Sequence, residues 1–173
     1  MTKNLIQSFF LFLILGLVQV LVGNNISLFN IATPFVFIYF LIRLPLTLNK
    51  NLTMAIAFLA GLIIDIFSDT QGMNALACTI LAVARIPILK LYVTHNDDIT
   101  SPIPSSKSLG VAVWLKYLLS TTLCYCLVIT FIESFTIDNY LISLYRAVGS
   151  TIFSFILLFG IDIIVNTKNE KRL

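Results

Sequence analysis

The chain has 173 residues, of which 58% are hydrophobic and only 11% are charged. Soluble domains contain about 45–50% apolar and about 25% charged residues, and a chain of this length cannot bury such an excess of apolar surface. Three Cys, seven Gly and five Pro also exclude disulfide-rich, collagen-like and disordered classes. The composition therefore predicts an integral membrane protein. The modest net charge of +3 does not indicate nucleic-acid binding.

Six apolar blocks follow one another along the chain, and each is close to the about 20 residues that a helix needs to cross a bilayer. They are apolar all round and lack the alternation of barrel strands, which predicts an all-α protein with six transmembrane helices in one domain over residues 1–173. The blocks are Leu5–Val22, Ile31–Leu48, Leu52–Phe67, Met73–Tyr92, Val111–Phe131 and Leu141–Val165.

The basic residues predict the orientation of these helices. If the N-terminus lies inside, six crossings place ten of the eleven Lys and Arg on the inner side, and Arg146 is the exception. Because cytoplasmic loops carry an excess of Lys and Arg, we expect both termini to be cytoplasmic.

The connections carry the usual signals of helix ends. Pro34 lies near the start of the second block and Pro45 near its end, where both are tolerated by a helix. Between the third and fourth blocks, Asp69 or Thr70 can cap the fourth helix, and Gly72 can relieve a tight turn. Residues 94–109 contain one His, two Asp, two Pro and several Ser, and are expected to form a plain solvated loop.

Two charged residues lie inside apolar blocks. At about 1.5 Å per residue, Asp65 lies about 10 Å below the outer surface, and Arg146 lies about 7–8 Å below it. Charges at such depths are costly and mark candidate functional sites. Three interpretations are open: a structural role, as an Asp65–Arg146 pair or an outer-leaflet polar network; a partner contact; and proton or ion transport. We predict that the two side chains face each other. Gly61, one turn before Asp65, would let a neighbouring helix approach closely.

The sequence contains no recognisable set of catalytic residues. The only His lies in the loop, no glycine-rich phosphate motif occurs, and the cysteines Cys78, Cys124 and Cys126 lack the spacing of a zinc site. We expect neither an enzyme nor a protein with a cofactor or a bound metal.

The stretch Ala57–Tyr92 resembles the family of the rod-shape-determining protein MreD. That family has a G-x-h-h-D segment at the end of its third helix (h is hydrophobic), a short turn ending in Gly, and an Ala-Leu pair at the start of the fourth helix. The matching residues are Gly61, Asp65, Gly72, Ala75 and Leu76. Prolines near both ends of the second helix, here Pro34 and Pro45, and a short basic tail also fit.

This resemblance implies a non-enzymatic subunit of the bacterial cell-elongation machinery. Such a subunit binds the bitopic protein MreC and helps to assemble the actin-like MreB, the glycosyltransferase RodA and a class B penicillin-binding protein. It also implies a six-helix bundle like that of the substrate-binding S-components of energy-coupling-factor transporters. Pro34, Gly61, Asp65, Asp69, Gly72 and Arg146 are the candidate structural or partner-binding residues.

The alternative function is that of such a vitamin-binding transporter subunit. It would require an outward-facing pocket in which several polar and aromatic side chains converge. The polar residues of the outer half fall mostly in turns, and we do not expect them to converge. They are Asn24, Asn25, Asp69, Gln71, Glu133 and Asp138.

Overall fold

The computed structural model describes residues 2–23, 33–93, 103–134 and 140–170, and every regular element within them is a helix. The all-α prediction is therefore confirmed for this part of the chain. The elements are α1 Thr2–Val18, its π-helical continuation η1 Gln19–Gly23, α2 Ile38–Ile42, α3 Lys50–Ser68, α4 Met73–Tyr92, α5 Ser106–Leu109, α6 Val111–Ser134 and α7 Tyr140–Glu170.

Four of these helices contain segments that are long and apolar enough to cross a membrane. A shorter apolar helix covers Ser8–Leu21. The four segments are Lys50–Ser68, Met73–Tyr92, Val111–Ser134 and Ser143–Val165. They agree with the last four predicted blocks to within a few residues, apart from the longer C-terminal end of α7.

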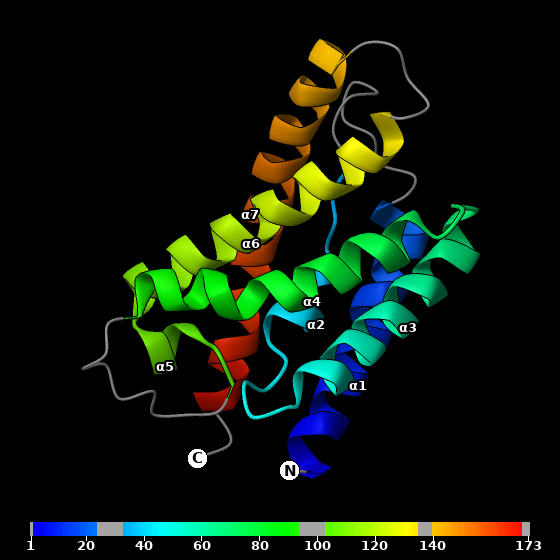
Figure 1. Ribbon diagram of the computed structural model, residues 1–173. Helices are drawn as coiled ribbons and strands as arrows, with labels where there is room; N and C mark the ends of the chain where they lie inside the picture. The colour runs from blue at the N-terminus through cyan, green and yellow to red at the C-terminus, as the bar shows by residue number, and fades with distance from the viewer. Residues whose placement is uncertain (1, 24–32, 94–102, 135–139, 171–173) are drawn as a thin grey trace.

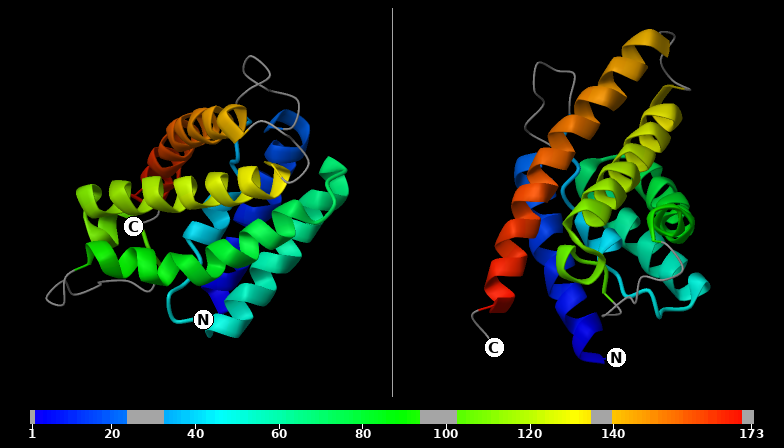
Figure 2. Two further views of the ribbon diagram at one scale, coloured as in Figure 1. Left: turned by 45° about the horizontal axis from the view of Figure 1, so that its top comes forward. Right: turned by 90° about the vertical axis from the view of Figure 1, so that its left-hand side faces the viewer.

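The long helices pack in chain order around a short central element (Figure 1). α3 and α4 form an antiparallel hairpin, α4 packs on α6, and α6 packs on α7. Figure 2 shows α1 and α7 on one side of the molecule, with α2 enclosed between them and the other helices. The first turn of α1 and the last turn of α7 lie toward the same end (Figure 1).

The prediction of a full second helix over Ile31–Leu48 is wrong for the described residues, 33–48. Only Ile38–Ile42 is α-helical, preceded by an irregular segment that begins at Thr33. Pro45 accounts for the end of the helix, since a proline disfavours a helical residue before it. Before α2, Phe35 N and Val36 N donate to the side chains of Ser154 and Gln19 and not to helix carbonyls. The broken segment is nevertheless the centre of the core: every residue from Val36 to Ile42 is buried.

The loop predicted over residues 94–109 is partly outside the described residues, which resume at 103. Its last part contains α5, a single turn of helix that was not predicted. Ser105 caps this turn, because its hydroxyl accepts a hydrogen bond from Ser108 N and Ser108 Oγ accepts one from Ser105 N. The end of the basic tail, residues 171–173, also lies outside the described part.

Candidate functional site

The α3–α4 turn has the left-handed backbone that its sequence predicts. Asp69, at the C-terminal end of α3, has φ 53°, and Gly72, at the N-terminal end of α4, has φ 79°. A glycine adopts this conformation without steric cost, and Asp tolerates it better than most residues. The side chain of Asp69 is exposed and makes no cap hydrogen bond to α4.

Asp65, and not Asp69, caps the start of α4. Its Oδ2 accepts a hydrogen bond from Ala75 N at 2.8 Å, and its Oδ1 accepts one from Asn74 N at 3.0 Å. The same Oδ1 accepts from Asn74 Nδ2 at 2.9 Å and from the Thr70 hydroxyl. A carboxylate with these donors at a helix N-terminus is stabilised by charge-assisted hydrogen bonds and by the helix dipole. This explains how Asp65 is accommodated while only 3% exposed.

Gly61 allows the backbones of α3 and α4 to touch. A Cβ atom built on Gly61 would lie 2.5 Å from Ala75 Cα and 2.6 Å from the carbonyl oxygen of Asn74. Real Cβ contacts are not this short, so only glycine fits at this position. The close approach expected at Gly61 is confirmed, and it brings α4 within reach of the Asp65 carboxylate.

The capped hairpin is tied to the rest of the core through Tyr125 of α6. The Tyr125 hydroxyl donates to Asn74 Oδ1 at 2.6 Å. The Tyr125 ring packs edge-on against Phe35 and Phe37, at centroid distances of 5.1 and 5.9 Å. The hairpin and the segment before α2 therefore share one buried polar and aromatic junction.

The irregular segment that begins at Thr33 lies along α7, and two of its backbone N–H groups donate hydrogen bonds to serines of α7. Thr33 N donates to Ser150 Oγ at 3.1 Å, and Phe35 N donates to Ser154 Oγ at 2.8 Å. The two donors are two residues apart in the segment, and the two acceptors are four residues apart in α7. These spacings have similar lengths, because an extended chain rises about 3.3 Å per residue and a helix about 1.5 Å.

Gln19 of η1 satisfies two further backbone groups of this segment. Its amide nitrogen donates to Pro34 O at 2.9 Å, and its amide oxygen accepts from Val36 N at 2.8 Å. Buried non-helical backbone needs such partners, because an unpaired N–H or C=O away from water is costly. Pro34, a predicted site residue, therefore lies within a hydrogen-bonded break in the helix.

Arg85 of α4 performs the equivalent task at the other end of α2. Its Nη1 donates to the carbonyl oxygens of Leu41 and Leu44, at 2.9 and 3.0 Å, and its Nη2 donates to that of Pro45 at 2.9 Å. The side chain is only 1% exposed. Because the last carbonyls of a helix lack intrahelical partners, this guanidinium caps α2 from a neighbouring helix.

A second polar cluster lies near the C-terminal end of α7. The hydroxyl of Tyr39 donates to Asp162 Oδ1 at 2.7 Å and accepts a hydrogen bond from Arg43 Nη1 at 3.2 Å. Arg43 also lies over the Tyr39 ring, 5.7 Å from its centroid. These contacts connect α2 and the residue that follows it to α7.

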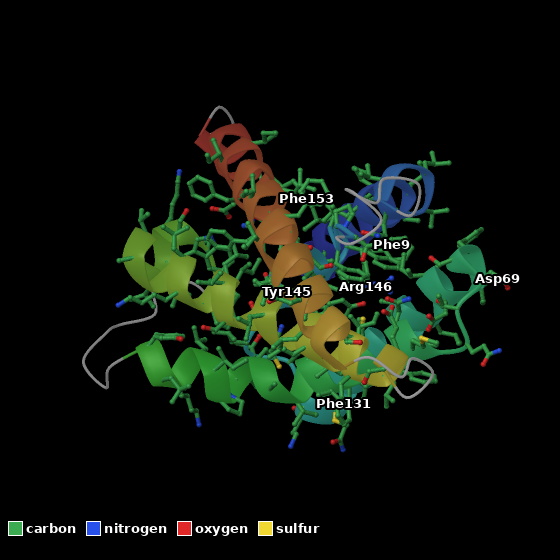
Figure 3. The ribbon with its side chains drawn as sticks, turned by 90° about the horizontal axis from the view of Figure 1, so that it is seen from above. Phe9, Asp69, Phe131, Tyr145, Arg146 and Phe153 are labelled. Atoms are coloured by element: carbon green, nitrogen blue, oxygen red, sulfur yellow. The ribbon has the colours of Figure 1, made fainter. Side chains whose placement is uncertain are left out.

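A pocket of about 200 Å³ lies between the C-terminal end of α6 and the N-terminal half of α7. We call it the outer pocket, after the side of the membrane on which the predicted topology would place it. Glu133 comes from α6, Arg146 from α7, and Phe35 connects the pocket to the Tyr125 junction. Figure 3 shows Arg146 on α7, well apart from Asp69 at the tip of the hairpin. The lining residues are Thr33, Phe35, Ile129, Thr130, Glu133, Arg146 and Ser150.

The predicted Asp65–Arg146 pair is wrong. The donors around Asp65 come from Thr70, Asn74 and Ala75, whereas Arg146 lines the outer pocket with Glu133. Asp65 and Arg146 have similar predicted depths in the membrane, but depth does not determine which helices are neighbours. The expectation that the outer polar residues do not converge agrees with the described ones, because Asp69 and Gln71 are exposed in the α3–α4 turn and only Glu133 of this set lines the pocket. Asn24, Asn25 and Asp138 lie outside the described residues.

Several residues that organise the core were not predicted from the sequence to do so. They share one signal, a polar side chain next to or inside an apolar run. Burial of such a side chain is costly unless other groups in the structure form hydrogen bonds with it. Arg85 was assigned only to the inner side by charge counting. The residues missed as organisers are Gln19, Asn74, Arg85, Tyr125, Ser150, Ser154 and Asp162.

Comparisons with protein-family models, curated proteins and solved structures find no match to this chain.

Proposed function

We propose that the protein is a non-enzymatic membrane scaffold subunit of the bacterial cell-elongation machinery, similar to MreD, and that it binds MreC. In this proposal it sits in the inner membrane within a larger complex that contains MreB, RodA and a class B penicillin-binding protein. Its role is to organise peptidoglycan synthesis and so determine cell shape.

The observation that carries the proposal is the way in which the residues of the resemblance fold together. Gly61 touches Ala75, Asp65 caps the helix that contains Ala75, and Gly72 forms the turn between them. Leu76 follows on the outer surface, 51% exposed. Residues that match a family pattern and also form one packed unit support the family role better than a match of scattered positions.

The proposed topology has six crossings with both termini cytoplasmic. α1 and η1 together span residues 2–23, about 33 Å at 1.5 Å per residue, which is enough for a bilayer core. The segment from Thr33 to Ile42 serves as a discontinuous second crossing, since four non-helical residues and six residues with helical backbone, Phe37 included, cover about 22 Å. An even number of crossings agrees with Figure 1, in which the first turn of α1 and the last turn of α7 lie toward one end of the molecule.

The proposed contact surface for MreC is the outer, apolar face of the α3–α4 hairpin. Ile66 and Phe67 at the end of α3 are 71% and 65% exposed, and Leu76 lies on α4 close by in sequence. In lipid, helices associate through close van der Waals fit, so substitution of these side chains tests the surface directly.

The test is co-purification of MreC with the tagged protein in mild detergent. Wild type should recover MreC, and Ile66→Ala with Leu76→Ala should lower the recovery several-fold. The matched control is Ile164→Ala on α7, a residue with 67% exposure, which should behave as wild type. Equal recovery with all variants would reject this surface.

A vitamin-binding transporter subunit is the second candidate, and the outer pocket is the observation in its favour. Its volume of about 200 Å³ is below the about 300–1,000 Å³ typical of pockets for drug-sized ligands. The scaffold role therefore remains the better supported one. Binding of a radiolabelled vitamin, together with consistent absence of MreC from the purified protein, would favour the transporter role instead.

A further inference from the structure

The outer pocket brings together two opposite charges that the scaffold role does not use. Glu133 is the last but one residue of α6, and Arg146 lies near the start of α7. Arg146 Nε is buried and has no hydrogen-bond partner among the described residues. Glu133 and Arg146 attract each other across the pocket, but no direct ion pair joins them within the part of the chain that the structure describes.

The hydroxyl groups beside these two charges differ in the hydrogen bonds that they can still form. Ser150 lies one turn after Arg146 on α7, and since its oxygen accepts from Thr33 N, its own hydrogen can be donated to an anion. Thr130 lies one turn before Glu133 on α6 and donates to Cys126 O, so its oxygen can accept from a cation. The α7 side is thus suited to an anion and the α6 side to a cation.

The volume limits the size of the ligand. About 200 Å³ corresponds to about seven waters at about 30 Å³ each, close to the about eight non-hydrogen atoms of a phosphoethanolamine group. A ligand with one anionic and one cationic group would supply an acceptor to Arg146 and a donor to Glu133 at once. Both groups are partly withdrawn from water, which makes such charge-assisted hydrogen bonds strong.

We propose that the outer pocket binds a small zwitterion, with its phosphate or carboxylate on Arg146 and Ser150 and its ammonium group on Glu133 and Thr130. The phosphoethanolamine headgroup of an outer-leaflet lipid and a free zwitterion in solution share this chemistry. The proposal does not depend on MreC binding, so either can fail without the other.

The first experiment uses wild-type protein and distinguishes the two sources. Protein is extracted from bilayers of equal phosphatidylethanolamine and phosphatidylglycerol, and native mass spectrometry measures which lipid is retained. In parallel, phosphoethanolamine is added to protein in phosphatidylglycerol nanodiscs, and Tm is measured. About tenfold enrichment of phosphatidylethanolamine identifies a lipid headgroup, because one charge-assisted contact is worth about that factor. A rise in Tm with phosphoethanolamine alone identifies a free zwitterion. Equal retention of both lipids with no change in Tm would overturn the proposal.

The second experiment assigns the two sides of the pocket. Glu133→Gln should remove the preference for phosphoethanolamine over inorganic phosphate and leave phosphate binding in place, whereas Arg146→Gln should weaken both by about tenfold or more. Asp69→Asn and Lys116→Gln change exposed charges outside the pocket and should match wild type. If inorganic phosphate protects wild type as well as phosphoethanolamine does, the pocket is an anion site and the assignment of Glu133 is wrong.

Discussion

Gly61→Ala should separate the two helices of the hairpin. The added methyl group would lie 2.5 Å from Ala75 Cα, whereas ordinary contacts begin near 3.4 Å, so α4 must move by about 1 Å. A shift of that size would lengthen the 2.8 Å bond from Ala75 N to Asp65 beyond hydrogen-bonding distance. Overpacking costs about 1–3 kcal/mol and a lost bond to a charged group about 1.5–3 kcal/mol.

The expected loss of stability is therefore about 2.5–6 kcal/mol, or roughly 5–24 °C in Tm for a chain of this size. Thermal unfolding in nanodiscs, followed by circular dichroism, measures it. Two glycines provide matched controls: a Cβ on Gly160 meets no atom within 4 Å, and a Cβ on Gly16 lies at an ordinary 3.5 Å from Ile64. Gly160→Ala and Gly16→Ala should leave Tm unchanged or raise it. A Gly61→Ala protein as stable as these controls would refute the close packing of α3 on α4.

Three further predictions follow from the polar contacts and the charge distribution. Arg85→Lys should cost about 2–4 kcal/mol by thermal unfolding, because a single ammonium group cannot serve three separate carbonyls, whereas the exposed Lys90→Arg should be neutral. Tyr39→Phe and Asp162→Asn should show a coupling of about 1 kcal/mol in a double-mutant cycle, and strictly additive losses would contradict their hydrogen bond. A reporter enzyme that is active only outside the cytoplasm should be silent when fused after Leu173, and strong activity would contradict the six-crossing topology.

The sequence predicted the long helices well because composition and length alone determine them. α3, α4, α6 and α7 each follow from an apolar run bounded by turn residues, and Gly61 could be recognised as a close-approach residue from its position one turn before Asp65. The same hydropathy gave a false second helix. Its amino acids are as apolar as those of its neighbours, and only Pro34 and Pro45 indicated that the backbone breaks there.

The partners of the buried polar residues could not be predicted from one sequence. Asp65 and Arg146 have similar depth, but depth does not determine which residue faces which. The contacts of Arg85 with the end of α2 cross about 40 positions of the chain, and those of Ser154 with Phe35 cross 119. Such long-range pairs depend on which helices are neighbours and on how each helix is rotated about its axis. The hydrophobic periodicity of one sequence does not determine either. The outer pocket was missed for the same reason, since Glu133 and Arg146 lie on two different helices.

The most direct test of the proposed scaffold role is in-cell photo-crosslinking from the α3–α4 hairpin. A photoreactive phenylalanine derivative at Phe67 should form a covalent product with MreC, and the same residue at Ile164, which is equally exposed on α7, should not. A crosslink to MreC from position 67 alone is the result that the proposal predicts. Formation of no MreC product from position 67, in cells in which the protein is expressed and folded, would contradict it.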